Sequence, residues 1–172
     1  MFVPLQVIST YSLLQSTNRI PDLVQTAKDR GYITLALTDK NVMYGAVAFY
    51  NACRAAGIKP ILGLTLTTQA IGETTQPSEL IFLAKDFTGY QQLMQLSTAY
   101  QVAEAPVDLS QQTANLTHLS MIVPLTGEVG QLLAIGDAAA ATKTVQQLQT
   151  WAPGNVAVGI LSLIHISEPT RP

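Results

Sequence analysis

Few side chains in this sequence could do catalytic or metal chemistry. It holds only two histidines, and His118 has no second potential ligand at strand or helical spacing, so a solvated or capping role is favoured over metal binding. The single cysteine, Cys53, falls on the apolar stripe of a predicted helix, which favours a core position over a catalytic thiol. Asp39 is the best carboxylate, because it follows a predicted strand, where α/β proteins place their active groups.

Asp39 admits several roles on the sequence alone. It could serve an active centre, cap the loop that follows it, or pair with Lys40 or another cation. Capping is favoured, because the sequence spacing identifies no second acid or histidine that would lie next to Asp39. The sequence has no P-loop, dinucleotide-binding glycine motif or nucleophile elbow, and Gly127 to Gly130 is too short for a phosphate loop. On chemical grounds alone, the residues predict an α/β domain and indicate no particular activity.

The elements that must position these residues follow from hydrophobic periodicity and from glycine and proline breaks. Strands are predicted at 2–8, 32–38, 58–68, 80–84, 119–124 and 155–160, and helices at 21–30, 44–56, 87–102, 128–135 and 138–151. Strands that alternate with helices over short connections predict a parallel α/β architecture. The pattern leaves open whether the sheet is doubly wound or part of a barrel.

Composition narrows the function classes. The 172 residues are 48% hydrophobic, which is enough for one domain with a substantial core. The net charge is −2 and no lysine or arginine stripe is present, which argues against a domain that binds DNA by itself. The longest apolar run, 156–166, is shorter than the ~20 residues of a membrane span. With one cysteine and no signal peptide, the sequence predicts a cytoplasmic protein without membrane contact.

Four segments of the sequence carry a family resemblance. They are 2–14 (FVPLQVISTYSLL), 36–50 (ALTDKNVMYGAVAFY), 57–63 (GIKPILG) and 83–93 (LAKDFTGYQQL). In this order they resemble the start of the PHP domain that opens the α subunit of bacterial DNA polymerase III, particularly the DnaE-type enzyme of low-GC Gram-positive bacteria. The resemblance implies that residues 1–160 are the N-terminal part of a PHP domain, an incomplete distorted βα barrel.

The same resemblance locates a metal site that this sequence has lost. The family positions concerned are occupied here by Pro4, Gln6, Ile8, Asp39, Lys40 and Thr65. Family members carry histidines along the first strand, often a histidine where Lys40 stands, and an acid where Thr65 stands. Proline and isoleucine have no donor atom, a glutamine amide is a weak ligand, and an ammonium repels metals. We therefore expect a vestigial site, with no catalytic, metal-binding or cofactor-binding residue.

The resemblance also implies a role within a larger protein. The parent would be a DNA-directed DNA polymerase, a nucleotidyltransferase that uses Mg²⁺ outside this region, and DNA would be reached only through the parent. The PHP region would be structural, packing against the remainder of the α subunit and docking replisome proteins. One alternative is a residual metal-dependent phosphoesterase or 3′–5′ exonuclease that uses Asp39. Another is a stand-alone binding module.

The last residues depart from this pattern. Residues 161–171 match the translation of a transposase-type sequencing adapter over eleven consecutive codons, so we expect 161–172 to be a non-native tail. His165 would then have no functional meaning. Because a βα barrel usually needs about 250 residues, we expect the isolated chain to be poorly stable or to aggregate.

Overall fold

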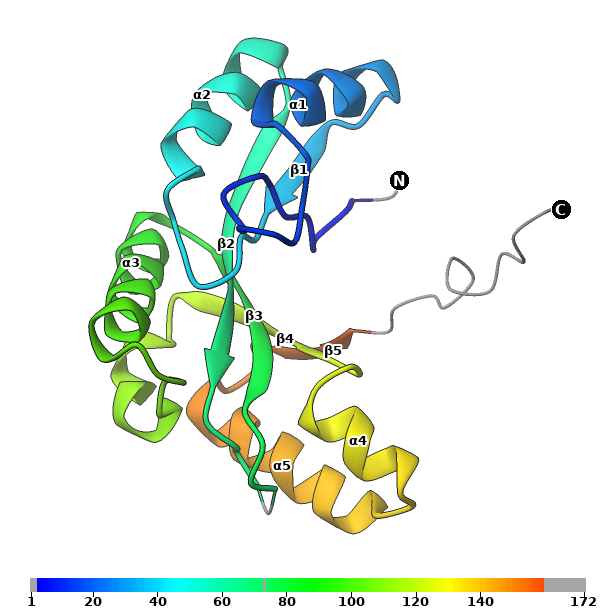
Figure 1. The fold of residues 1–172 in the computed structure, drawn as a ribbon, viewed down its shortest axis with the longest axis vertical. Helices are drawn as coiled ribbons and strands as arrows, with labels where there is room; N and C mark the ends of the chain where they lie inside the picture. The colour runs from blue at the N-terminus through cyan, green and yellow to red at the C-terminus, as the bar shows by residue number, and fades with distance from the viewer. Residues whose placement is uncertain (1–2, 73, 160–172) are drawn as a thin grey trace, which may run out of the picture.

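A computed structural model describes residues 3–72 and 74–159 as one curved sheet bordered by helices (Figure 1). The sheet has five strands in the order β1-β2-β3-β4-β5. Its strands are β1 (Thr34–Leu37), β2 (Lys59–Thr68), β3 (Ser78–Ala84), β4 (Leu119–Pro124) and β5 (Val156–Gly159). The helices are α1 (Ile20–Asp29), α2 (Ala46–Ala56), α3 (Phe87–Ala103), α4 (Glu128–Ala134) and α5 (Ala138–Trp151), with a 3-10 helix at Leu109–Asn115.

The sheet is mixed, so the prediction of parallel strands throughout is wrong. β1 pairs with β2 in parallel, and β4 pairs with β5 in parallel. β3 runs antiparallel to both of its neighbours, β2 and β4. Only residues 69–77 connect β2 to β3. So short a connection joins antiparallel neighbours, whereas a parallel pair needs a longer crossover.

The predicted strand at 2–8 is also wrong, because residues 3–9 form no regular strand. They run beside β1, where the amide of Ala36 donates to the carbonyl of Pro4 at 3.2 Å and that of Thr38 to the carbonyl of Val7 at 2.7 Å. Proline has no amide hydrogen to complete a ladder, so the pairing stays intermittent. The other predicted strands and helices are confirmed, to within two residues at each described end.

Local chemistry explains where the helices begin and end. Pro21 lies in the first turn of α1, where its missing amide hydrogen costs no helical bond. α2 ends at Gly57, whose φ of 76° is a left-handed conformation that glycine adopts without strain. The carboxylate of Asp86 caps α3 by accepting from the amide of Gly89 at 2.8 Å. No helix in the described ranges is long and apolar enough to cross a bilayer.

The core is divided between the two ends of the sheet. The larger cluster lies between one face of β2, β3 and β4 and helices α3, α4 and α5, and includes Leu64, Phe82 and Met121. The second joins α1, α2 and β1 around Phe49 and Cys53. In the view of Figure 1, α1 and α2 lie at the top, α3 at the left, and α4 and α5 at the bottom. The helices thus fix β1 and β2, whose ends carry the candidate site.

A substitution at Gly89 tests how closely α3 approaches β4. A Cβ at this position would overlap the backbone carbonyl oxygen of His118, which cannot rotate away. Alanine usually stabilises a helix relative to glycine, but here we expect Gly89→Ala to lower the free energy of unfolding by about 1–3 kcal/mol. Urea denaturation followed by the fluorescence of Trp151, the only tryptophan, measures this change. Equal or greater stability would contradict the packing, and exposed Thr98→Ala on α3 is the control.

Candidate functional site

Asp39 lies at the end of β1 and is only 2% exposed. Its Oδ1 accepts from the backbone amide of Ser9 at 2.6 Å and from the hydroxyl of Ser12 at 2.7 Å. Its Oδ2 accepts from the hydroxyl of Ser9 at 2.8 Å. Asp39 therefore caps a loop, which is the role that the sequence favoured. The loop, however, is 9–12, which precedes β1, and not the loop after it.

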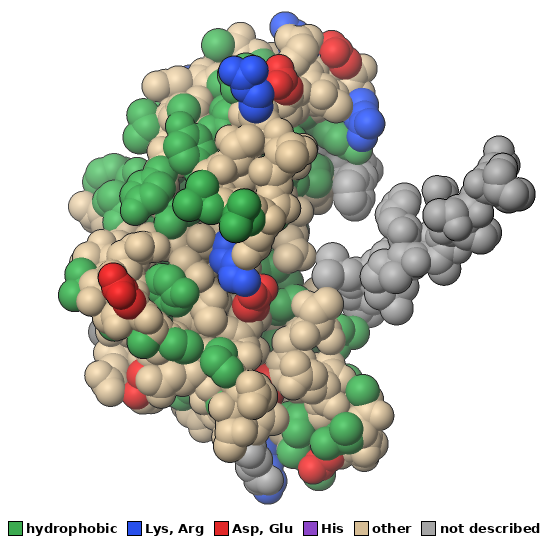
Figure 2. Space-filling view, in the orientation of Figure 1, with side chains coloured by type: hydrophobic (Ala, Val, Ile, Leu, Met, Phe, Trp, Pro, Cys, Tyr) green, Lys and Arg blue, Asp and Glu red, His purple; other side chains and the backbone are tan. Residues whose placement is uncertain are grey.

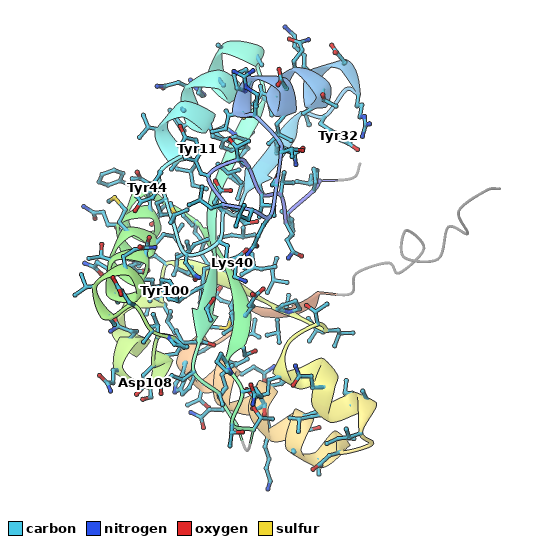
Figure 3. The ribbon with its side chains drawn as sticks, viewed as in Figure 1. Tyr11, Tyr32, Lys40, Tyr44, Tyr100 and Asp108 are labelled. Carbon is cyan, nitrogen blue, oxygen red and sulfur yellow. The ribbon has the colours of Figure 1, made fainter. Side chains whose placement is uncertain are left out.

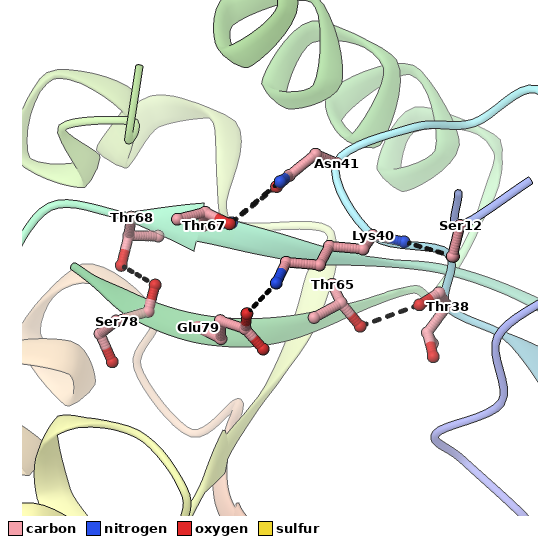
Figure 4. A network of polar contacts seen from close by, with 9 residues as sticks. All are labelled: Ser12, Thr38, Lys40, Asn41, Thr65, Thr67, Thr68, Ser78 and Glu79. Atoms are coloured by element: carbon pink, nitrogen blue, oxygen red, sulfur yellow. Dashed lines mark hydrogen bonds and ion pairs between the residues drawn. The ribbon is translucent and has the colours of Figure 1, made fainter. Parts of the chain in front are cut away.

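Lys40 forms an ion pair with a carboxylate that sequence reasoning missed. Its Nζ lies 2.5 Å from Oε1 of Glu79 on β3, and the two side chains are 28% and 41% exposed (Figure 4). Lys40 lies near the middle of the molecule (Figure 3), so the pair joins the end of β1 to β3. The alternative in which Asp39 pairs with Lys40 is not seen. A lone charge in the apolar β3 sequence was the available signal for Glu79.

Thr65, at the position where the resemblance implies an acid, is buried, and its hydroxyl faces the backbone. Its hydroxyl donates to the carbonyl of Thr38 at 2.8 Å, and its amide donates to the carbonyl of Asp39 at 3.0 Å. Thr65 also pairs with Lys40 in an isolated parallel bridge. These bonds extend the β1–β2 pairing past the end of β1 (Figure 4). Thr65 thus strengthens the strand pairing, and its hydroxyl proton is used in the hydrogen bond to the Thr38 carbonyl.

Asn41 is a second residue that sequence reasoning missed. Its φ is 60°, a region in which asparagine is enriched among non-glycine residues. Its side chain accepts from the amide of Thr67 at 2.7 Å and donates to the Thr67 hydroxyl at 3.0 Å. Its carbonyl accepts from the hydroxyl of Ser97 on α3 at 3.0 Å. Asn41 therefore fixes the chain between β1 and α2 against both β2 and α3.

The three positions of the first motif do not share one regular strand face. Gln6 is exposed, as is its neighbour Leu5, while Pro4, Val7 and Ile8 are all partly buried. Strict alternation fails because the segment is not a regular strand. The structure thus brings Asp39, Lys40 and Thr65 together by backbone pairing, but supplies no histidine or carboxylate from the first motif.

The donor set does not fit the multinuclear metal site that the resemblance implies. Both oxygens of Asp39 are held by serine donors, and Thr65 donates to a carbonyl. Lys40 adds a positive charge where a ligand is needed. Across the described residues, no group of three or more histidine, cysteine, aspartate or glutamate side chains is placed to hold a metal ion. A His and carboxylate metal cluster cannot be built from these groups.

The remaining chemical candidates have structural partners. Nδ1 of His118 lies 2.7 Å from Oδ2 of Asp86, and both side chains are about half exposed. The pKa of Asp86 is lowered, first by the hydrogen bond from the amide of Gly89 and next by that from His118. Burial raises the pKa of the Cys53 thiol to about 11, so it is a neutral core thiol at physiological pH. Cys53 thus lies in the core and His118 lies beside the residue that caps α3.

A buried acid outside this region, Glu128, is also structural. Its Oε2 accepts from the amide of Ile71 at 2.8 Å, and its Oε1 accepts from the amide of Gly72 at 2.9 Å. Its own amide donates to the hydroxyl oxygen of Ser78 at 3.2 Å. Glu128 therefore fastens the β2–β3 connection to the start of α4. Sequence reasoning missed it, because the contact joins segments far apart in the chain.

Most of the sequence matches the model of one protein family. Residues 4–161 match the model of the PHP domain. The chain belongs to the PHP domain family. This confirms the predicted α/β fold class. A solved structure described as a putative metal-dependent phosphoesterase from Bifidobacterium adolescentis shares the fold, with a TM-score of 0.52 at 9% identity over 92% of this chain and 85% of that chain.

Sequence relatives confirm the homology to DNA polymerase III α subunits. The chain is 49% identical over 100 residues to the DNA polymerase III subunit alpha of Bacillus subtilis, covering 58% of this chain and 9% of the relative. It is 40% identical over 128 residues to that of Halalkalibacterium halodurans, covering 73% and 11%. The chain thus spans about a tenth of the length of these curated relatives. The predicted tail at 161–172 lies outside the described residues and stays a prediction.

Replacing Asp39 separates a structural carboxylate from a metal ligand. In Asp39→Asn, an amide NH₂ would face serine donors, so we expect the free energy of unfolding to fall by about 2–3 kcal/mol. A metal-ligating carboxylate without its metal would instead be relieved by neutralisation. Urea denaturation in EDTA measures the effect.

Asp137→Asn is the matched control, because Asp137 accepts from the amide of Ala140 as the cap of α5 and asparagine caps helices equally well. Unchanged or raised stability of Asp39→Asn would contradict the structural assignment.

Proposed function

We propose that this chain is a metal-free, catalytically silent PHP region of a DNA polymerase III α subunit, and that its role is structural. Homology to the α subunit and membership of the PHP family support the setting. The hydrogen-bonded environment of Asp39 supports the proposed lack of catalytic activity. In this reading the domain keeps the family's fold but not its metal chemistry.

The hydrogen bonding of Asp39 carries the proposal. A carboxylate offers about four lone-pair sites, and three are taken by two hydroxyl donors and one amide donor. These donors stabilise the buried negative charge, which a metal ion would otherwise do. Rebuilding a metal site would require the 9–12 loop to be released. The ion pair of Lys40 with Glu79 adds a fixed cation beside it.

The parent protein supplies the setting for this role. Nucleotidyl transfer with Mg²⁺ would belong to the parent polymerase, and DNA would be bound through it. The PHP region would pack against the remainder of the α subunit and contribute to contacts with replisome proteins in the cytoplasm. The low charge of the chain, −2 with 12% charged residues, supports a partner role in preference to direct DNA binding.

A residual phosphoesterase or 3′–5′ exonuclease is the competing function, favoured by the fold shared with a putative metal-dependent phosphoesterase. It would have to work through Asp39 with ligands that the described residues do not supply.

Metal content and hydrolysis decide between the two functions. The full-length polymerase and its Asp39→Asn variant would be analysed for Zn²⁺, Mn²⁺ and Fe by mass spectrometry, and assayed with p-nitrophenyl phosphate. We expect equal metal content in both proteins and hydrolysis at background, while polymerase activity confirms that both are folded. A PHP protein that retains its histidines is the positive control. Stoichiometric metal that disappears in Asp39→Asn, together with phosphate release, would overturn the proposal.

A further inference from the structure

An apolar groove lies between α2 and α3 on the outer surface. It has a volume of about 550 Å³. Its apolar lining comes mainly from Val47, Tyr50, Pro60, Leu62, Phe87 and Tyr90. Figure 2 shows hydrophobic side chains gathered on this side of the molecule, from α2 to the neighbouring end of α3. We name this surface the α2–α3 groove.

The groove residues are exposed to an unusual degree for aromatic and aliphatic side chains. Phe87 is 71% exposed, Val47 64% and Tyr50 46%, and Tyr44 beside them is 69% exposed. Val47 and Tyr50 are three residues apart, so they share the outward face of α2, which a surface helix normally makes polar. Aromatic residues are enriched at protein interfaces, and a gathered apolar patch marks an interaction site.

The charged residues at the rim are already engaged within the domain. Lys85 donates to the side chain of Asn155 at 2.5 Å, and the carboxylate of Asp86 faces His118 at 2.7 Å. The groove therefore offers a partner mainly apolar and aromatic contact. This chemistry does not suit a nucleic acid, whose phosphates require free cations.

The shape of the groove restricts the partner further. A two-fold dimer pairs a surface with its own copy, and two concave grooves facing each other would leave a void between them. A groove between two helices instead accepts a convex element such as a helix with an apolar face. The relatives that this chain matches are about ten times longer than the matched region, so in those proteins a large body accompanies this domain in the same polypeptide.

From this geometry we infer that the α2–α3 groove is the surface on which the polymerase body of the same polypeptide packs, through apolar side chains of a helix. The inference rests on the proposed function, since it takes the chain as part of an α subunit. Phe87 and Tyr50 are the central anchors, because they combine large area with exposure, and such residues dominate binding energy.

The test uses the full-length polymerase with Tyr50→Glu and Phe87→Glu combined. Both changes suit the local helices, since position 87 begins α3 and position 50 lies four residues before Arg54. We expect hydrogen–deuterium exchange of residues 46–56 and 87–94 to rise about tenfold or more as docking is lost. Val47→Glu is a second variant with the same expected direction.

The matched control is Leu133→Glu with Ile135→Glu, at the end of α4, where the exposed fractions are 48% and 77%. Glutamate is unfavourable at the C-terminal end of a helix. The control changes are therefore expected to destabilise their own helix more than the test changes destabilise α2 and α3. We expect the control to exchange like the wild type at α2 and α3. Circular dichroism confirms the fold of each variant.

Two outcomes would overturn the inference. One is exchange at α2 and α3 that is equally fast in the wild type and in the groove variants, which means that nothing covers the groove. The other is a concentration-dependent dimer that Tyr50→Glu with Phe87→Glu abolishes, which assigns the groove to a second copy. Metal content and p-nitrophenyl phosphate hydrolysis, measured on the same samples, report on the silent site independently of either result.

Discussion

The buried carboxylate of Asp39 is the interaction on which the arrangement around β1 depends. A charge that is 2% exposed must be met by donors, and here the donors come from Ser9 and Ser12, about thirty residues earlier in the chain. Meeting that charge fixes the 9–12 loop over the end of β1. The hydroxyl of Ser12 in turn accepts from the amide of Lys40 at 3.0 Å, which continues the network along the chain.

The same network meets the polar groups at the end of β1 from within the domain. Here Thr65 bonds the backbone of β1, and Lys40 is paired with Glu79 across the sheet. The polar groups of Thr65 and Lys40 thus have partners inside the domain.

The outer surface has a different character from this polar network. Only 12% of the residues are charged, and the rim charges of the α2–α3 groove are engaged by internal partners. Aromatic side chains such as Phe87 remain exposed there. This apolar and aromatic character of the α2–α3 groove is suited to contact within a larger protein.

The sequence by itself determined the local elements and the family. Pro21 and Gly57 set helix ends through their own backbone chemistry, so those boundaries were predictable. That Pro4 and Ile8 carry no side-chain donor atom was equally readable, because this is a property of the residue type. The loop-capping role of Asp39 was also favoured, although on the wrong loop.

Only the tertiary structure decided which distant residues meet. β3 runs antiparallel to its neighbours, and the first predicted strand is an irregular extended segment. Glu79 lies beside Lys40, and Glu128 binds the β2–β3 connection. The tertiary structure also placed α2 beside α3 to form the groove. Periodicity reports which face of an element is buried, but strand order and long-range pairing depend on the packing of the whole core, which no local pattern encodes.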